Sequence, residues 1–289
     1  IASSIDTAEE VYVKENSVLT ISLQKPMTDR SPKQFEFEAA FDLDAEAVGL
    51  DKSLASIRTA KDDDRIEGIS IEHTFLQSGM SQTQAMRDAL TDFKESGKFI
   101  YAYHDFFTQK DYYLASVADS VFVHPEGGVE LAGLASEVLY LKEFQDITGI
   151  EMQVIRSGAY KSAVEPFLQD EMSDENREQI KSLLDSFWAE MVVKIEERTA
   201  LTPTKINEIA SSLDALVSAN AVELGVVDNV LLRNEYTELL RAKMELEEDD
   251  KLHTIDIEDY QQTVSTQIGE GKDRIAVVYA QGEIIYGEG

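Results

Sequence analysis

The sequence predicts an α/β fold in which helices cover a largely parallel sheet, and two observations support this prediction. Short runs rich in Val, Ile and aromatic residues alternate along the chain with segments whose apolar residues recur at helical spacing. The chain has 289 residues, 43% of them hydrophobic, which is enough to form a full core. Parallel strands need long crossover connections, usually helices, so the alternation indicates a parallel sheet with helices on its faces.

The first half of the chain contains the predicted strands and the helices that connect them. The strands are expected at Val18–Leu23, Ile66–Ile71, Phe99–Tyr103, Ser120–Val123 and Met152–Ile155. The connecting helices are expected at Ala45–Ala60, Gln82–Glu95, Lys110–Ala118 and Glu137–Thr148. Helical spacing gathers apolar residues on one face, so these helices are expected to pack against the sheet.

The second half of the chain is mainly helical. Glu175–Glu197 carries apolar residues at helical spacing, and either Ser173 or Asp174 is expected to cap its start. Pro203 is suited to the first turn of a further helix, because a proline there removes no helical hydrogen bond. Gly225 is expected to end the next short helix.

Composition excludes several classes of function. Acidic residues number 56 against 26 basic ones, a net charge of −30, whereas a phosphate backbone needs a basic surface, so no nucleic-acid partner is expected. Solubility explains the acidity most simply, and attraction of basic peptides is the alternative. The chain has no cysteine, which excludes disulfides, thiolate metal sites and a cysteine nucleophile. No apolar run approaches the roughly 18 residues of a membrane span.

One segment has neither the charge of a solvated face nor the regularity of a core element. It is Arg156-Ser-Gly-Ala-Tyr-Lys-Ser-Ala-Val-Glu-Pro-Phe167. It resembles the lysine motif of the signal peptide peptidase A (protease IV) family, serine proteases with a Ser/Lys dyad. Lys61–Arg65, Gln109–Asp119 and Ile275–Gly282 also resemble that family, in its order and at its spacing. The resemblance implies a crotonase/Clp-protease-like spiral with a parallel β core covered by helices.

The resemblance assigns Lys161 as the general base. A serine hydroxyl becomes an effective nucleophile when a base takes its proton, and a lysine accepts a proton only when neutral. The pKa of lysine in water is roughly 10.4, and burial among apolar groups lowers it. The neighbours of Lys161 in sequence are mostly apolar, which is consistent with such burial. Ser162 is expected to orient the base, and Tyr160 and Glu165 to position and pack the motif.

The nucleophile is expected beyond Gly289. In the long form of the family it lies in a second domain, on a Gly-Gly-Ser-type turn after a strand. The corresponding turn of this chain has Gln77 and Ser78 in place of the glycine pair, followed by Gly79. We interpret this turn as a degenerate copy that is kept for structure. Ser78 or Ser81 as a working nucleophile is the less favoured alternative.

The resemblance also implies the organisation of the whole protein. Residues 1–270 are expected to form an N-terminal crotonase-like domain, and residues 271–289 a linker and the first strand of a second, truncated one. Because the chain starts at Ile1, it is expected to be a fragment without its membrane anchor. Signal peptides and other apolar peptides are the expected partners. A homo-oligomer, a tetramer in the long form, is expected in the cell envelope, with the catalytic domain outside the cytoplasm.

No cofactor or metal is expected. The four histidines lack paired spacing, which argues against zinc, and no nucleotide-binding glycine motif follows a strand. They are His73, His104, His124 and His253. The acidic run Asp62–Asp64 is expected to be a solvated helix end, and Gly127-Gly128 a plain turn.

Two other functions compete with the protease. An acyl-CoA hydratase or isomerase on the same fold needs acidic catalytic residues near a thioester oxyanion hole, and that chemistry has no use for the lysine motif. A non-catalytic scaffold domain would keep Lys161 only as a relic. A serine at the nucleophile turn beyond Gly289 would decide between scaffold and enzyme.

Overall fold

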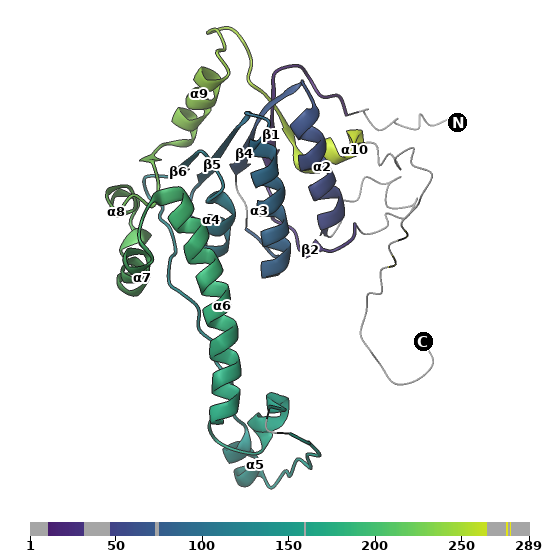
Figure 1. Ribbon diagram of the computed structural model, residues 1–289, viewed down its shortest axis with the longest axis vertical. Coiled ribbons are helices and arrows are strands. Elements are labelled where there is room, and N and C mark those ends of the chain that lie inside the picture. The colour runs from purple at the N-terminus through teal and green to yellow at the C-terminus, as the bar shows by residue number, and fades with distance from the viewer. Residues whose placement is uncertain are drawn as a thin grey trace, which may run out of the picture.

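A six-stranded parallel sheet forms the centre of the molecule in a computed structural model of the chain (Figure 1). The structure describes residues 11–31, 47–72, 75–158 and 160–264, and the two positions 276 and 278. The strand order is β7-β6-β5-β4-β1-β8, and all neighbours pair in parallel, which confirms the predicted α/β fold. The strands are β1 (Ser17–Ile21), β4 (Ile66–Glu72), β5 (Phe99–His104), β6 (Ser120–Val123), β7 (Asn229–Val230) and β8 (His253–Asp256). A separate parallel pair joins β2 (Met27–Thr28) to β3 (Val48–Gly49).

Helices cover both faces of the sheet, because successive side chains of a strand point to opposite faces. Ile100 and Ala102 of β5 belong to the larger core cluster, whereas Phe99 and Tyr103 belong to a smaller one with Tyr236 of α9. The larger cluster includes residues of α2 (Leu50–Asp62), α3 (Met80–Lys94), α4 (Gln109–Ala115), α6 (Asp174–Thr199), α7 (Pro203–Ser212), the 3₁₀ turn η2 (Asp214–Leu216), α8 (Ser218–Glu223) and α10 (Ile257–Thr263). On the opposite face, α9 (Arg233–Lys243) packs on the smaller cluster.

Residues 134–187 form an arm that projects from the domain. The arm consists of α5 (Lys142–Thr148), the 3₁₀ helix η1 (Ser162–Phe167) and the first half of α6. Figure 1 shows α6 running away from the sheet, with α5 at its far end. Three described residues of the arm are buried, Gln145, Glu165 and Asn176, and all three are polar. The arm therefore has no apolar core among its described residues.

Two elements predicted for the arm differ from the structure. Met152–Ile155 forms no strand, and Ile155 is fully exposed. The expected helix Glu137–Thr148 starts only at Lys142. The missing strand has a physical cause, since the arm leaves the sheet and so offers an extended segment no strand to pair with.

Helix ends agree closely with the predicted signals. Ser173 caps α6, because its hydroxyl accepts a hydrogen bond from the Asn176 amide. Pro203 occupies the first turn of α7, and Gly225 follows α8 in the left-handed conformation, with φ of 75°. The edge strand β8 was not predicted, because its sequence follows a charged run and contains few apolar residues.

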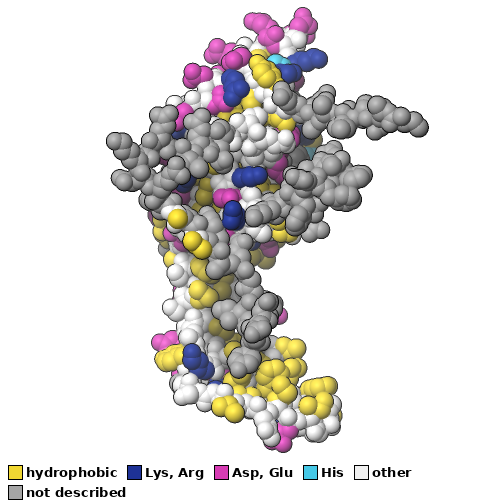
Figure 2. All heavy atoms as spheres, turned by 90° about the vertical axis from the view of Figure 1, so that its right-hand side faces the viewer, with side chains coloured by type: hydrophobic (Ala, Val, Ile, Leu, Met, Phe, Trp, Pro, Cys, Tyr) yellow, Lys and Arg dark blue, Asp and Glu magenta, His cyan; other side chains and the backbone are white. Residues whose placement is uncertain are grey.

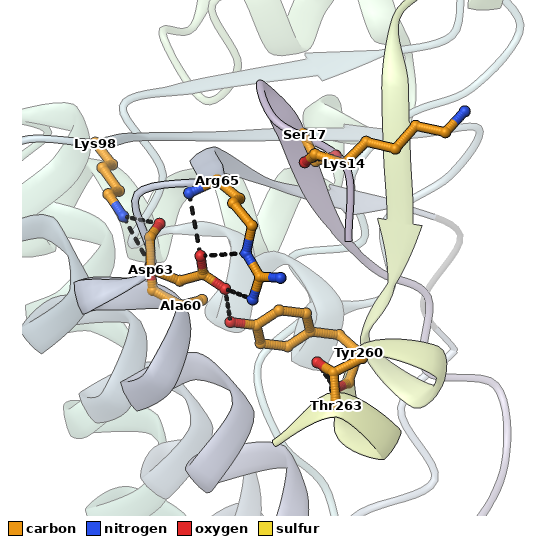
Figure 3. Close-up of polar contacts among 8 residues, drawn as sticks. All are labelled: Lys14, Ser17, Ala60, Asp63, Arg65, Lys98, Tyr260 and Thr263. Atoms are coloured by element: carbon orange, nitrogen blue, oxygen red, sulfur yellow. Dashed lines mark hydrogen bonds and ion pairs between the residues drawn. The ribbon is translucent and has the colours of Figure 1, made fainter. Parts of the chain in front are cut away.

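The acidic run at the end of α2 was expected to be solvated, which is wrong for Asp63. Its side chain is 9% exposed and accepts hydrogen bonds from the Arg65 guanidinium (2.7 and 2.9 Å) and the Tyr260 hydroxyl (2.8 Å). Lys98 donates to the backbone carbonyls of Ala60 and Asp63 beside it (Figure 3). Because Tyr260 belongs to α10, this cluster ties the C-terminal end of the described chain to α2.

The Gly127-Gly128 pair is a site of close backbone packing rather than a plain turn. A Cβ atom on Gly127 would lie 1.8 Å from the Asp105 carbonyl oxygen, and one on Gly128 would lie 2.0 Å from that of Leu216. Side chains are therefore excluded at both positions. The linker and strand predicted at residues 271–289 lie outside the described residues except for Ala276 and Val278, which are exposed.

Candidate active site

Lys161 lies in a turn on the arm, immediately before η1. The turn depends on Gly158, whose φ of 99° favours glycine, and the Lys161 amide donates to the Gly158 carbonyl (3.4 Å). η1 packs against α5, at the far end of the arm. The local sequence therefore presents Lys161 away from the sheet.

Glu165 holds η1 against the start of α6. Its buried carboxylate accepts hydrogen bonds from the Ser173 hydroxyl (2.5 Å) and from the Asn176 amide group (3.0 Å). Burial by itself raises the pKa of the Glu165 carboxyl, but the hydrogen bonds from Ser173 and Asn176 outweigh it, and the pKa lies below its ordinary value. A carboxylate at the N-terminus of a helix also interacts favourably with the helix dipole. Glu165 thus sets the position of the lysine turn relative to α6.

Two further residues of the motif fasten this turn. The Arg156 guanidinium donates to the Lys161 backbone carbonyl (3.4 Å) and lies 3.7 Å from the Glu165 carboxylate. The Tyr160 hydroxyl donates to Glu178 of α6 (3.4 Å), although the Tyr160 side chain is half exposed. No hydrogen bond joins Ser162 to Lys161 within the described residues. The turn is thus anchored through Arg156, Tyr160 and Glu165.

The Lys161 side chain is exposed, and its ammonium has no partner among the described residues. The apolar surroundings expected for Lys161 are therefore not formed by the described part of this chain, because the arm carries it away from the core. Apolar side chains are nevertheless plentiful on the arm, and Figure 2 shows them gathered at its far end. The exposed ones are Leu134, Leu139, Phe144, Ile147, Ile150, Met152, Ile155, Tyr160, Leu168, Leu183 and Phe187.

The predicted degenerate turn connects β4 to α3, and its polar groups are engaged within the domain. The Ser78 hydroxyl is buried and hydrogen-bonds to that of Thr83 (2.8 Å). The Gly79 amide, at the N-terminal end of α3, donates to the Gln82 side chain (2.9 Å). Gln77 donates from its side chain to the Gln24 carbonyl (2.7 Å).

Lys110 of α4 contacts this turn, and the sequence did not predict that contact. Its ammonium donates to the backbone carbonyls of Ser78 (2.6 Å) and Leu76 (3.1 Å). The next residue, Asp111, accepts a hydrogen bond from the Leu76 amide (3.1 Å). Lys110 lies in the Gln109–Asp119 segment, whose resemblance to the family was evident from the sequence, but its contact with a turn 32 residues away was not.

The predicted base Lys161 and the degenerate turn at Ser78 are not brought together. Ser78 lies at the end of β4 in the domain, and Lys161 lies on the arm. Among the described residues, no hydrogen bond or ion pair joins them. Ser81 is exposed on the first turn of α3.

The histidines that the structure describes are dispersed. His104 stacks on Phe107 with ring centroids 4.3 Å apart, His124 accepts a turn hydrogen bond from the Glu126 amide, and His253 begins β8. His73 lies outside the described residues. No group of three potential metal ligands occurs in the part of the chain that the structure describes.

Comparison with known proteins identifies the family. The model described as peptidase family S49 matches residues 92–247, more than half of the chain. The chain belongs to peptidase family S49. This agrees with the predicted family and fold class. The match includes the arm with Lys161 and leaves out the turn at Ser78.

Similar proteins carry protease names. The chain is 31% identical to "Protease 4" of Haemophilus influenzae over 81% of its length, and 29% identical to "Protease 4" of Salmonella typhi over 81%. It is 27% identical to "Serine protease SPPA, chloroplastic" of Arabidopsis thaliana over 94%. The matches span 40%, 39% and 39% of those proteins, so the chain corresponds to well under half of each relative. No described helix is both long and apolar enough to cross a membrane.

Proposed function

We propose that this chain is the lysine-bearing part of a serine peptidase of family S49 that degrades cleaved signal peptides. In this proposal Lys161 is the general base, and the nucleophilic serine lies in the part of the protein beyond Gly289. The observation that carries the proposal is the Lys161 turn, which is anchored through its neighbours while the ammonium itself is exposed and without a partner among the described residues.

The engaged turn at Ser78 supports a nucleophile outside this chain. A working serine needs its hydroxyl next to the base and free amide donors for the oxyanion. The Ser78 hydroxyl instead bonds to Thr83, and the Gly79 amide bonds to Gln82. The ammonium of Lys110, the lysine that contacts this turn, donates to the backbone carbonyls of Leu76 and Ser78 and not to the Ser78 hydroxyl.

The proposed chemistry is proton transfer from a serine hydroxyl to the neutral amine of Lys161. The serine oxygen then attacks the peptide carbonyl, and the amine returns the proton to the leaving nitrogen. Neutrality requires that Lys161 be shielded from water, because burial disfavours an ammonium ion. The apolar side chains of the arm supply a surface that shields it once another domain or subunit covers them.

The same surface is the basis for proposing an oligomer. Apolar residues are exposed along most of the arm, and a soluble monomer rarely exposes such a continuous patch. We propose that the rest of the protein and further copies of it cover this surface, and that the enclosed groove accepts the apolar middle of a signal peptide. The net charge of −30 favours the basic start of such peptides. An anchor outside this chain would hold the enzyme in the cell envelope.

Lys161→Ala in the full-length protein tests the base assignment. Hydrolysis of a signal-peptide substrate should fall by about three powers of ten or more without loss of folding. Lys161→Arg should be no better, because an arginine stays charged. The matched control is Lys181→Ala, which removes an exposed lysine from the same arm. Near-normal turnover by folded Lys161→Ala would refute the assignment.

The pH dependence of the hydrolysis rate of the full-length enzyme tests whether Lys161 acts as a shielded general base. The rate should rise through the neutral and mildly alkaline range as the shielded lysine loses its proton. A profile that rises only near about pH 10, the range of free lysine, would contradict a shielded base. If the full-length protein has a serine at the nucleophile turn beyond Gly289 and yet hydrolyses no peptide, a non-catalytic scaffold is favoured.

A further inference from the structure

An open cavity of about 580 Å³ lies at the end of the sheet opposite the Ser78 turn. Its walls come from the second half of α3, the loop Ser116–Asp119 before β6, the last turns of α6, and Asp228 before β7. Ser78 lies where β4 ends, whereas this cavity lies where β6 and β7 begin. The cavity is thus separate from the degenerate turn at Ser78 and from Lys161 on the arm.

Arg87 of α3 is the unusual side chain of this cavity. It is 5% exposed, yet its guanidinium forms no ion pair with any residue in the described ranges. Its Nε donates to the Ser116 hydroxyl (3.3 Å), and its guanidinium carbon lies 5.7 Å from the centre of the Tyr113 ring. The two terminal nitrogens make no hydrogen bond to a described residue. These two nitrogens are not among the buried unsatisfied atoms of the described residues, so they reach the open cavity, where they are available to an oxyanion.

The carboxylates around the cavity do not fill this role. Asp119 pairs with Lys94 (2.8 Å), Glu197 pairs with Lys194 (2.9 Å), and Asp228 pairs with Arg198. The fourth, Asp88, is exposed, and it follows Arg87 directly on α3, so the two side chains point in different directions. Arg87 is thus the cation of the cavity that is left without a partner among the described residues.

Lys94 supplies a second donor in the same cavity. The two residues are seven positions apart on α3, so they lie on one face of the helix. The Lys94 ammonium donates to the Val117 carbonyl (3.0 Å) and to Asp119, which leaves one of its three protons. A guanidinium edge and an ammonium proton together match the oxygens of a carboxylate or phosphate.

We infer that this cavity binds a small oxyanion, a carboxylate or a phosphate, between the Arg87 guanidinium and the Lys94 ammonium. The cavity volume is typical of small-molecule sites. A bound oxyanion would give Arg87 the partner that it lacks. It would also link α3 to the end of α6, from whose other end the arm projects. The inference does not depend on the proposed peptidase activity.

Titration of the full 289-residue chain tests the site with two probes, inorganic phosphate and succinate, in a buffer without other oxyanions. Binding is followed by calorimetry and by the NMR shifts of the Thr91 and Ser116 amides, which line the cavity. At least one probe should bind saturably with one site, at millimolar concentration or below. Binding of one probe alone would narrow the ligand class to phosphates or to carboxylates.

Variants of Arg87 make the test specific. Arg87→Gln should weaken binding at least about tenfold. Arg87→Lys should weaken it less, because a lysine keeps the charge but lacks the paired N–H donors of the guanidinium. Arg58→Gln is the matched control, since it removes an exposed arginine from α2 and should change affinity by less than about twofold. If Arg87→Gln does not fold, Arg87→Lys decides. Unchanged affinity in the folded variants would overturn the inference. So would the absence of saturable shifts with both probes up to about 50 mM.

Discussion

Replacing Asp63 with Asn should destabilise the folded chain by up to about 2 kcal/mol at neutral pH, and the loss should disappear in acid. The ordinary pKa of an aspartate carboxyl is 3.8, and the hydrogen-bonded Arg65 guanidinium lowers that of Asp63 to about 2. A difference of this size corresponds to about 2 kcal/mol. The Asp63 side chain is 9% exposed and that of its partner Arg65 is 38% exposed, so solvent screens part of the interaction and about 2 kcal/mol is the upper end of the expected loss.

The sign of the pH dependence follows from the lowered pKa. In the folded chain Asp63 stays charged down to about pH 2, whereas in the unfolded chain it takes up a proton near 3.8. Its contribution is therefore complete well above pH 4 and is lost as the pH falls through the folded value. The difference between wild type and Asp63→Asn should shrink to about half at pH 3 and be small at pH 2.

Urea denaturation followed by circular dichroism, at pH 7 and pH 3, measures the difference. Asp64→Asn is the control, because Asp64 is exposed and has the same charge in the same turn. It should cost less than about 0.5 kcal/mol at either pH. An equal loss in both variants, or a loss in Asp63→Asn that does not change with pH, would refute the reasoning from the Asp63–Arg65 pair.

Three further outcomes are expected. Gly127→Ala should destabilise the domain by about 2 kcal/mol or more, because the added Cβ would lie 1.8 Å from the Asp105 carbonyl oxygen. Thermal unfolding measures this loss, and an unchanged melting temperature would contradict the close packing. Glu165→Ala should destabilise the arm without destabilising the sheet, since Glu165 joins η1 to α6. In limited proteolysis the arm should be cut roughly tenfold faster than in the wild type while the sheet stays resistant, and an unchanged rate of cleavage in the arm would argue against this role. A fluorophosphonate probe should label the full-length enzyme but not the 289-residue chain, and stoichiometric labelling of Ser78 in the chain would show that it carries its own nucleophile.

The sequence by itself determined the central sheet and the helix ends. Strands β1, β4, β5 and β6 were predicted because a strand buried on both faces must be a short, nearly continuous apolar run. The starts of α6 and α7 were predicted from the cap candidates Ser173 and Asp174 and from Pro203, since capping depends on residues next to each other in the chain, and Ser173 is the cap in the structure. The lysine motif and the family were also evident from local strings of residues.

Only the tertiary structure decided where the apolar faces go. Apolar spacing in Glu137–Ile155 indicated a helix and a strand, but spacing does not tell whether such a face packs on its own domain or remains exposed on an arm. Contacts between positions distant in sequence could not be predicted from local patterns either. Tyr260 reaches Asp63 across 197 residues, and Lys110 reaches Ser78 across 32, because the fold brings together segments that no local pattern relates. The exposure of Lys161 has the same origin, since burial is a property of the surroundings and not of the motif.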